Sequence, residues 1–393
     1  MNLNSKNDGA AAVLAEAANA AVHSVNGRAK PSANGSANGH ANGSANGKSN
    51  GKTNVSATVL RPAPPVDITL RMMALEPCLR RVEDEIERMI STPVKLIADI
   101  AAHTLGAGGK RLRPALTVLS AQICGDDETN PSPRVIKSAG AVELIHTTTL
   151  LHDDVVDDAQ VRRGKPAANL VWGNETSVLV GDFLFAQVFV NAAKENFGGL
   201  LLPIATATAE MCAGELMETQ MRGNLSMSEE QYFEIIALKT AALTDCACRL
   251  GALAVEANED DVERLGRYGH AIGMAFQIVD DVFDVASTQG RIGKPVGNDI
   301  REGDITLPML RAMAVCPASE CAELQAVVGQ TPLTDEGVAR ALDIIRGSDA
   351  VDYALDKAAE FVALAKEQLA HFEPCAAREM LELLADYVVS REK

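Results

Sequence analysis

From Val66 onward, apolar side chains recur about every 3.6 positions, which is the spacing of one buried helix face. In the first such segment these positions are Ile68, Leu70, Met73, Leu75, Leu79, Val82, Ile86 and Ile90. Pro77 lies inside the segment and is expected to kink or split the helix, because proline lacks a backbone donor. Long segments rich in Ala and Leu follow, separated by short stretches with Gly, Pro and Asn. The pattern predicts a succession of amphipathic helices.

Alternating runs of Val, Ile and Thr, which are typical of β-strands, are nearly absent. Aromatic residues make up only 4% of the chain while Ala and Leu abound, and this composition favours helix over sheet. Hydrophobic residues make up 47%, which is enough for a large core. Residues 65–393 are therefore predicted to form one all-α domain, a helical bundle with its functional site on facing helices.

Residues 1–64 follow a different pattern. The dipeptide Asn-Gly recurs every four positions from Asn34 to Gly51, among Ser, Ala and Lys. Such a stretch has too little apolar surface to offset the entropy that is lost when a chain becomes ordered. It is predicted to be a flexible, low-complexity tail, and binding to a partner is the alternative role.

Charge and cysteine content narrow the function further. The formal net charge of −17 disfavours nucleic acid or an anionic membrane surface as a partner. The eight cysteines are scattered without a Cys-x-x-Cys pair, so we expect reduced thiols, packed as small hydrophobic residues, in a cytoplasmic protein. No run of 18 or more apolar residues occurs, and we expect no transmembrane segment.

Two acidic clusters of the form Asp-Asp-x-x-Asp lie in apolar helical sequence. The first contains Asp153, Asp154 and Asp157, and the second contains Asp280, Asp281 and Asp284. The first and last aspartate of each cluster share a helix face, where like charges repel each other. A cation relieves this repulsion, and Mg²⁺ takes carboxylate oxygens together with waters and substrate phosphates. The clusters predict a Mg²⁺ site, and two solvated acidic faces are the alternative.

Two basic loops accompany the acidic clusters. One contains Lys110, Arg111 and Arg113 after two glycines, and the other contains Arg162, Arg163 and Lys165. Helix starts favour anions, and Arg and Lys bind phosphate oxygens. A single basic run is usually a solvated surface. The combination of two basic and two acidic segments indicates a diphosphate held partly by metal and partly by Arg and Lys.

The acidic clusters and the basic loops make the chain similar to a known family. From about Val66 to the C-terminus it resembles the trans-prenyltransferases, which are isoprenyl diphosphate synthases. The resemblance rests on segments in the family's order: 108–114, 153–157, 162–164, 239–240, 276–277, 280–284 and 293–294. The stretch 144–153 looks most like the bacterial long-chain members, which make octaprenyl to decaprenyl diphosphate. The resemblance implies an isoprenoid synthase-type all-α bundle with a central cavity for metal and diphosphate.

The resemblance also implies roles for individual residues. The metal ligands would be Asp153, Asp157 and Asp280, with Asp154, Asp281 and Asp284 in or near the coordination shell. The allylic diphosphate would be held by Arg162 and Lys294. Isopentenyl diphosphate would be held by Lys110, Arg113, His146 and Arg163. The residues beside the ionising carbon would be Lys239, Thr240 and Gln277.

The implied reaction is the Mg²⁺-dependent, successive head-to-tail condensation of isopentenyl diphosphate with an allylic diphosphate such as farnesyl or geranylgeranyl diphosphate. Thr148 and Thr149 precede Asp153 by about one helical turn. Bulky aromatic residues commonly block this place in short-chain relatives. Because both threonines are small, we expect a long tunnel and an octaprenyl to decaprenyl product that supplies a quinone side chain.

Three alternatives share part of this pattern. The nearest is a short-chain synthase that makes geranylgeranyl diphosphate. A terpene cyclase shares the fold and the first aspartate motif, but the second Asp-Asp-x-x-Asp and the 108–114 loop favour coupling over cyclisation. A non-catalytic subunit of a heteromeric synthase would be expected to lose aspartates or the basic loop, and this chain keeps both. The resemblance further implies a homodimer.

Overall fold

The structure, a computed structural model, describes residues 66–106, 111–194, 198–287, 296–328 and 333–390. The predicted tail, Lys110 and Lys294 lie outside the described residues. The described helices belong to one compact unit, Leu60–Lys393. Apart from one short hairpin, the regular structure of these residues is helical, which confirms the predicted all-α class.

The first part of the unit holds most of the helices that will form the walls of a central cavity. In chain order these elements are α2 (Val66–Met89), α3 (Lys95–Leu105), α4 (Leu112–Ile123), α5 (Pro133–Val156), β1 (Val161–Arg162), β2 (Lys165–Pro166), α6 (Ala168–Trp172), α7 (Asn174–Lys194) and α8 (Gly198–Met221).

The second part supplies the remaining walls and the helices that cover them. Its elements are α9 (Glu229–Ile236), the π-helix η1 (Ala237–Ala241), α10 (Ala242–Ala254), α11 (Glu259–Ala286), α12 (Asn298–Glu302), α13 (Leu307–Val315), α14 (Ala318–Val328), α15 (Asp335–Gly347), α16 (Ala350–Leu369) and α17 (Ala376–Ser390).

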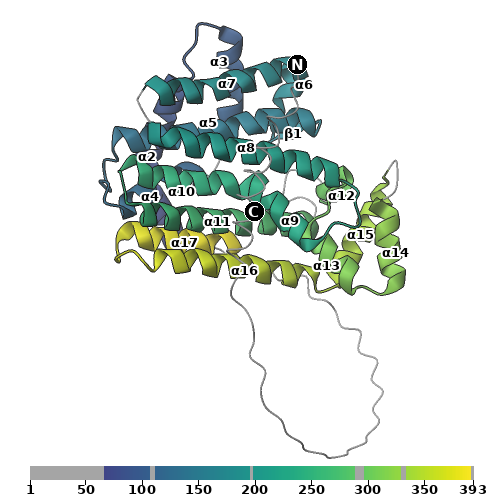
Figure 1. The fold of residues 1–393 in the computed structure, drawn as a ribbon. Coiled ribbons are helices and arrows are strands. Elements are labelled where there is room, and N and C mark those ends of the chain that lie inside the picture. Colours follow the sequence, from purple (N-terminus) through teal and green to yellow (C-terminus); the bar gives the residue numbers. More distant parts are fainter. Residues whose placement is uncertain (1–65, 107–110, 195–197, 288–295, 329–332, 391–393) are drawn as a thin grey trace, which may run out of the picture. The chain divides into compact units, whose positions relative to one another are not determined.

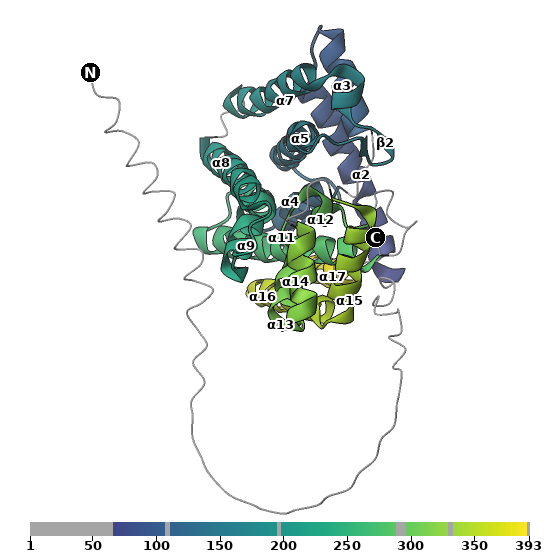
Figure 2. The ribbon, with the colours of Figure 1, turned by 90° about the vertical axis from the view of Figure 1, so that its right-hand side faces the viewer.

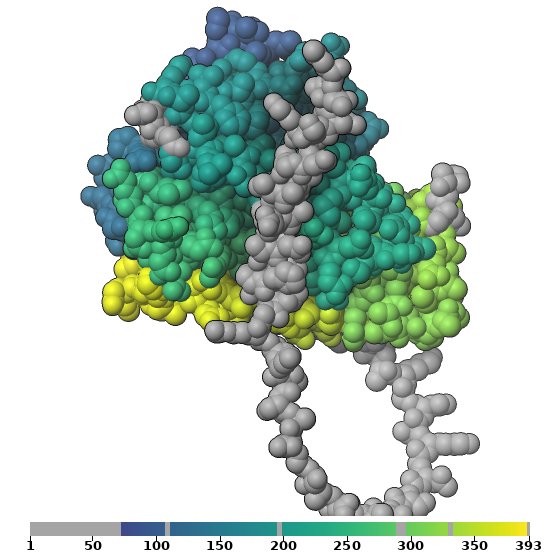
Figure 3. Space-filling view, in the orientation of Figure 1, coloured from purple at the N-terminus to yellow at the C-terminus, as the bar shows by residue number. Residues whose placement is uncertain are grey.

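Helix α10 lies at the centre of the bundle and packs against α4, α5, α8 and α11. Figure 1 shows these helices as successive rods, with α16 beneath α11 and with α13–α15 gathered at one end. In the view turned by 90°, α5 and α7 lie on one side of the bundle and α13 and α16 on the other (Figure 2). The space-filling view shows the yellow and light-green residues of the C-terminal helices along one edge of this face (Figure 3). The layers enclose one continuous hydrophobic core.

Two central helices begin at clear caps and end at the acidic clusters. Ser132 caps α5 by accepting from the Val135 backbone N–H, and Asn258 caps α11 by accepting from the Asp261 N–H. The second cluster and the first two aspartates of the first cluster fall in the last turns of these helices, where the backbone dipole is negative, and Asp157 directly follows α5. Carboxylates at such helix ends are disfavoured unless a cation is close, which strengthens the case for a bound metal.

The structure differs from the sequence expectation at two places. Of the two outcomes expected at Pro77, a kink or a split, the split does not occur: helix α2 runs through Pro77, and Leu75, Cys78 and Val82 on either side are buried in the core, which offsets the lost hydrogen bond. The segment expected to be a plain loop at 163–166 belongs to a two-stranded antiparallel hairpin, with Arg162 opposite Lys165. Each strand has only two paired residues, which is too short for an alternating pattern to be visible in the sequence.

Two of the described helices have the length and composition of a membrane-spanning helix, although no transmembrane segment was expected. Asn174–Lys194 and Gly199–Met221 are long and apolar enough to cross a membrane, by length and composition alone. Core helices of proteins without a membrane segment pass the same test, so one or two such helices are weak evidence. The absence of a transmembrane segment therefore stays a prediction.

Candidate active site

One cavity of about 1440 Å³ brings together residues that are far apart in the sequence. Its walls come from α4, α5, α7, α8, η1, α10 and α11, together with the hairpin and the end of α17. Eleven of the residues singled out from the sequence line it: Arg113, His146, Thr148, Thr149, Asp153, Arg162, Arg163, Lys239, Thr240, Gln277 and Asp280. The two acidic clusters, about 127 positions apart, therefore each contribute an aspartate to the same cavity.

Asp153 is the aspartate of the first cluster that lines the cavity. Burial, together with the nearby negative charge of Glu215, raises the pKa of Asp153 to about 7. A carboxylate with a raised pKa has too little positive charge nearby to stabilise its ionised form. Asp153 is therefore a site where a cation would be strongly stabilising.

Asp157, the last aspartate of the first cluster, forms an ion pair with Arg222 at 3.0 Å. The same guanidinium donates to Asp304 at 3.1 Å, so Arg222 links the end of α8 to both acidic groups. Asp157 is absent from the residues that line the cavity. A metal ion at Asp157 would have to share its carboxylate with Arg222.

Three of the four remaining aspartates have protein donors that the structure identifies. Asp154 is buried and pairs with Arg162 at 2.6 Å. Asp281 is also buried and accepts from Tyr232 at 2.7 Å and from Gln277 at 2.8 Å. The two oxygens of Asp284 accept the backbone N–H groups of residues 298 and 299, at 3.1 Å each. These contacts orient the helix ends on which the cavity-facing aspartates lie.

The hairpin between α5 and α6 positions two arginines. Its two turn residues, Arg163 and Gly164, both have positive φ, as a two-residue hairpin turn requires. The left-handed conformation is uncommon for an arginine, so the turn holds this side chain in a defined place at the cavity. Arg162, on the adjoining strand, also lines the cavity.

His146 and Arg113 form a buried part of the cavity wall. Burial lowers the pKa of His146 well below its ordinary value, and the charge of Arg113 and of the other arginines lowers it further, so the imidazole is neutral. Burial also lowers the pKa of Arg113. Among the described residues, the Nε of Arg113 is buried without a hydrogen-bond partner. A neutral imidazole and an unpaired guanidinium N–H can both donate to an anion.

Lys239 and Thr240 lie in the π-helix η1, where the wider turn moves both residues toward the cavity. Two glycines permit this packing: a Cβ at Gly214 would lie 2.5 Å from the Lys239 backbone nitrogen, and a Cβ at Gly273 would lie 2.5 Å from the Ala241 Cα. Close approach of α8 and α11 to η1 therefore requires glycine at these positions.

Lys239 is paired with two carboxylates of α8. It contacts Glu215 at 2.9 Å and also Glu218. Burial alone would lower the pKa of Lys239, but the two glutamates outweigh it and raise this pKa. The ammonium is charged and fully compensated, so the cavity beside it carries no excess positive charge from this residue.

The donors and acceptors of the cavity fit a divalent cation and a phosphorylated ligand. The Oε1 atom of Glu215 is a buried acceptor with no partner among the described residues, whereas Arg113 Nε is a donor with none. Both residues line the cavity. Aspartate oxygens are the hard ligands that Mg²⁺ and Ca²⁺ prefer, and arginines suit phosphate. Opposite kinds of unpaired atoms in one cavity match a ligand that carries both a metal ion and anionic oxygens.

The structure brings to the site several residues that were not predicted from the sequence. Glu215 and Glu218 compensate Lys239, Arg222 pairs with Asp157, and Tyr232 donates to Asp281. Two glutamates one turn apart in the apolar helix α8 were a detectable signal. For Arg222 and Tyr232 there was none, because their partners are far away in the chain.

Comparison with known proteins agrees with this geometry. The family model described as polyprenyl synthetase matches residues 94–345. A nonaprenyl diphosphate synthase from Mycobacterium tuberculosis is 39% identical over 79% of this chain and 91% of that protein. A short chain isoprenyl diphosphate synthase from Methanothermobacter thermautotrophicus is 36% identical over 82% of this chain and all of that protein.

A solved structure extends the agreement to the fold. The polyprenyl synthase from Caulobacter crescentus, crystallised with calcium and isoprenyl diphosphate, has a TM-score of 0.79 and 40% identity. The match covers 84% of this chain and 99% of that one. The chain therefore belongs to the polyprenyl synthetase family and is a prenyl diphosphate synthase of the all-α fold.

Proposed function

We propose that the protein catalyses the Mg²⁺-dependent, successive condensation of isopentenyl diphosphate with an allylic diphosphate, to give a long all-trans polyprenyl diphosphate. The observation that carries this proposal is the single cavity that Asp153 and Asp280 share with Arg113, Arg162 and Arg163. Acidic groups suited to metal and basic groups suited to diphosphate line a space whose remaining walls are largely apolar.

Asp153, Asp157 and Asp280 would hold the Mg²⁺ ions, with Asp154, Asp281 and Asp284 supporting them. Bound Mg²⁺ supplies Lewis-acid stabilisation of the charge on the departing diphosphate. The raised pKa of Asp153 supports this assignment, because burial and nearby carboxylates outweigh the positive charges of Lys239 and Arg162 at this carboxylate.

The basic side chains would divide the two diphosphates between them. Arg162, with Lys294, would hold the allylic diphosphate, and Arg113, His146 and Arg163, with Lys110, would hold isopentenyl diphosphate. The unpaired Nε of Arg113 and the neutral imidazole of His146 support this role, since both can donate to phosphate oxygens.

The reaction requires stabilisation of charge rather than a protein nucleophile. The allylic C–O bond breaks, its electron pair leaves with the diphosphate, and a cation remains on the prenyl chain. The double bond of isopentenyl diphosphate attacks this cation and forms a carbon–carbon bond. A proton then passes to the released diphosphate, and a new double bond forms. The apolar walls exclude water that would otherwise capture the cation.

Lys239, Thr240 and Gln277 would lie beside the ionising carbon. The two glutamates that compensate Lys239 support this role, because a bare ammonium would oppose a carbocation. Thr240 and Gln277 contribute oxygen dipoles whose negative ends stabilise positive charge without forming a covalent bond.

Two features support a long product. Thr148 and Thr149 are small, and their hydroxyls donate to their own helix, to the carbonyls of Leu144 and His146, so no unpaired donor faces an apolar chain. The cavity of about 1440 Å³ also exceeds the roughly 300–1,000 Å³ of a usual small-molecule pocket. A product of this kind fits a quinone side chain.

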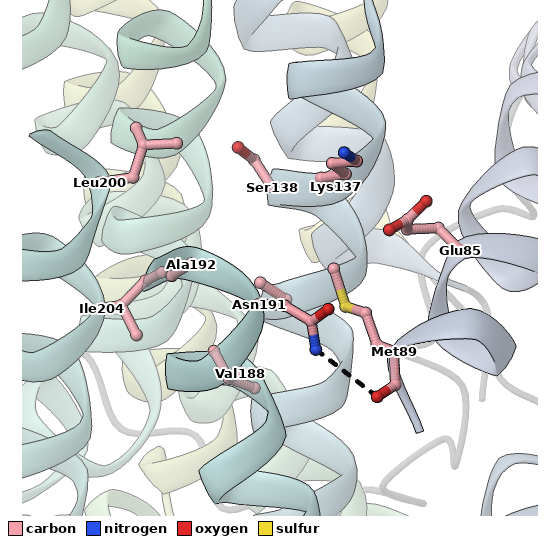
Figure 4. Close-up of a pocket in the computed structure, with 10 residues that line it drawn as sticks. Glu85, Met89, Lys137, Ser138, Val188, Asn191, Ala192, Leu200 and Ile204 are labelled. Atoms are coloured by element: carbon pink, nitrogen blue, oxygen red, sulfur yellow. Dashed lines mark hydrogen bonds between the residues drawn. The ribbon is translucent and has the colours of Figure 1, made fainter. Parts of the chain in front are cut away.

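A separate small pocket near the start of α5 would be the far end of the path that the product tail takes; Figure 4 shows the side chains that line this pocket. It lies further along the same helices, with Ser138 on α5, Val188 on α7 and Ile204 on α8. Polar side chains also line it, including Glu85 and Asn191, whose amide donates to the Met89 carbonyl at 3.5 Å (Figure 4). An apolar tail that reached this end would meet polar groups, which is a physical reason for elongation to stop.

One observation favours a shorter product, geranylgeranyl diphosphate. The path along α5 from Asp153 to Ser138 is about 22 Å at roughly 1.5 Å per helical residue. A zigzag of four carbon–carbon bonds of about 1.5 Å gives roughly 5 Å per isoprene unit, so an extended tail of about four units fills this distance. An octaprenyl or decaprenyl tail would have to fold back within the wide cavity.

The decisive experiment measures the products directly. The purified full chain is incubated with labelled isopentenyl diphosphate, Mg²⁺ and, in separate reactions, geranyl, farnesyl or geranylgeranyl diphosphate, and the chains are separated by chromatography. Octaprenyl to decaprenyl products support the proposal, whereas accumulation of geranylgeranyl diphosphate establishes the shorter alternative. Absence of any elongated chain from a folded protein would overturn both.

We further propose a cytoplasmic homodimer. Leu179 on α7 and Leu202 on α8 are 60% and 73% exposed, and apolar exposure on two neighbouring helices suits packing against a second copy. All eight cysteines are free thiols, which suits a reducing compartment. Light scattering during gel filtration tests the dimer: Leu202→Glu should weaken it and Leu364→Glu on α16 should not, while a monomeric parent contradicts it.

A further inference from the structure

The hydroxyl of Thr240 forms an unusual hydrogen bond for a helical threonine. Other threonines in the described helices donate to a carbonyl of their own helix: Thr104, Thr117, Thr147, Thr148, Thr149, Thr208, Thr219 and Thr244. Thr240 instead donates to the side-chain oxygen of Gln277 on α11, at 2.8 Å. The hydroxyl proton of Thr240 is therefore donated to another side chain and not to its own backbone. The lone pairs of this hydroxyl are available at the cavity that Thr240 lines.

The amide of Gln277 has only one orientation that satisfies its neighbours. Its nitrogen donates to Asp281 at 2.8 Å, one helical turn further along α11. The other oxygen of Asp281 accepts from Tyr232, so both carboxylate oxygens serve as acceptors and the NH₂ group of Gln277 faces Asp281. The amide oxygen then faces Thr240, and the Thr240 proton must point toward it.

Tyr232 is the last member of this chain of hydrogen bonds, on the side of Asp281 away from the cavity. Its hydroxyl, on α9, donates to the second oxygen of Asp281 at 2.7 Å. Tyr232 and Asp281 are 3% and 5% exposed, and neither lines the cavity, whereas Gln277 and Thr240 do. A buried, fully hydrogen-bonded carboxylate thus lies directly behind the two polar side chains that face the reacting centre.

We propose that Tyr232 and Asp281 are positioning residues that fix the direction of this hydrogen-bond chain, so that Thr240 presents oxygen lone pairs to the allylic cation. The inference rests on the proposed function of the cavity and adds to it a purpose for two residues behind its wall. If the amide of Gln277 turned over, its NH₂ group would meet Thr240, and the hydroxyl proton would point into the cavity. The positive end of that dipole would then oppose the cation.

The experiment is a double-mutant cycle on Tyr232 and Thr240. Thr240→Val should lower kcat roughly 100-fold, as expected for loss of an oriented dipole, and Tyr232→Phe roughly 10-fold, as expected for loss of one hydrogen bond. The KM values of both diphosphates should stay near parental. Because Tyr232 acts through Gln277 and Thr240, the double variant should lose clearly less than the product of the two single losses.

Tyr268→Phe is the matched control. Tyr268 lies on α11, is fully buried and donates to the Leu381 carbonyl at 2.8 Å, away from the hydrogen-bond chain of Tyr232. Tyr268→Phe should keep the parental kcat, and its change in melting temperature should be similar to that of Tyr232→Phe. Asp281→Asn provides a second test: it should lower kcat while leaving the Mg²⁺ concentration for half-maximal activity unchanged.

Three results would overturn the inference: a parental kcat for Tyr232→Phe, a full additional loss when Tyr232→Phe is added to Thr240→Val, or a strongly increased Mg²⁺ requirement in Asp281→Asn. The last result would make Asp281 a metal ligand instead. Each of these outcomes is measured against an active parent enzyme. A parent that elongates no prenyl chain would refute the proposed function itself, which is a separate result.

Discussion

Replacing Thr148 by phenylalanine tests whether the product tail runs along α5. Thr148 is only 3% exposed and forms part of the cavity wall about five residues before Asp153. Its hydroxyl already bonds the Leu144 carbonyl, so the replacement removes one intrahelical hydrogen bond and adds a ring. The ring can enter the cavity rather than the packed core, so the destabilisation should stay near the lower end of about 1–3 kcal/mol for overpacking.

The size of the effect follows from the length of helix beyond the substitution. From Thr148 to Ser138, where the small pocket lies, the helix spans about 15 Å at roughly 1.5 Å per residue. At roughly 5 Å for a zigzag of four carbon–carbon bonds, this length corresponds to about three isoprene units. Thr148→Phe should therefore shorten an octaprenyl to decaprenyl product by about three units or more.

The assay compares the chain lengths from parent, Thr148→Phe and the control Thr148→Val, with labelled isopentenyl diphosphate and one allylic primer. Valine matches threonine in shape and should leave the product length unchanged. Thermal melting of each variant verifies that the protein is folded. A folded, active Thr148→Phe enzyme with the parental product would show that the tail does not pass this residue.

Three further predictions concern the metal, the pH dependence and the tail. Chelation of divalent cations should abolish turnover and added Mg²⁺ should restore it; persistent turnover in excess chelator would contradict the metal site. The pKa of Asp153 is raised to about 7, so its ionised form is disfavoured in the folded protein and the metal-free protein should lose stability as pH rises through about 7. Mg²⁺ favours that ionised form, so the increase in melting temperature on adding Mg²⁺ should be larger at about pH 8 than at about pH 6, and an equal increase would refute this linkage. Deletion of residues 1–60 should leave turnover near parental, measured with the same labelled substrate, and a large loss would contradict a passive tail.

Much of the fold was accessible from the sequence because helices are specified by local spacing. The apolar period after Val66, the scarcity of aromatic residues and the absence of alternating runs all predicted an all-α protein, and the structure confirms this class. The first and last aspartate of each cluster could be predicted to share a helix face from their spacing alone. The hairpin at 161–166 was missed because two paired residues per strand leave no periodic signal.

The candidate site was only partly accessible, because its contacts join distant parts of the chain. The sequence indicated that aspartates and basic side chains meet, and Asp153, Asp280 and Arg113 do line one cavity. It did not reveal that Asp281 is held by Tyr232 from another helix. That partner depends on how α9 packs on α11, which local spacing does not encode.

The sequence by itself determined the kind of chemistry, since the residue types that bind metal and phosphate are written in short motifs on helices. Only the tertiary structure decided which of the six aspartates face the cavity and which are held by protein donors. The physical reason is that an aspartate's role depends on its neighbours: Asp153 lies at the cavity, where burial raises its pKa, whereas Asp284 accepts two backbone N–H groups. Those neighbours are brought together by packing between helices, after the local pattern has already been satisfied.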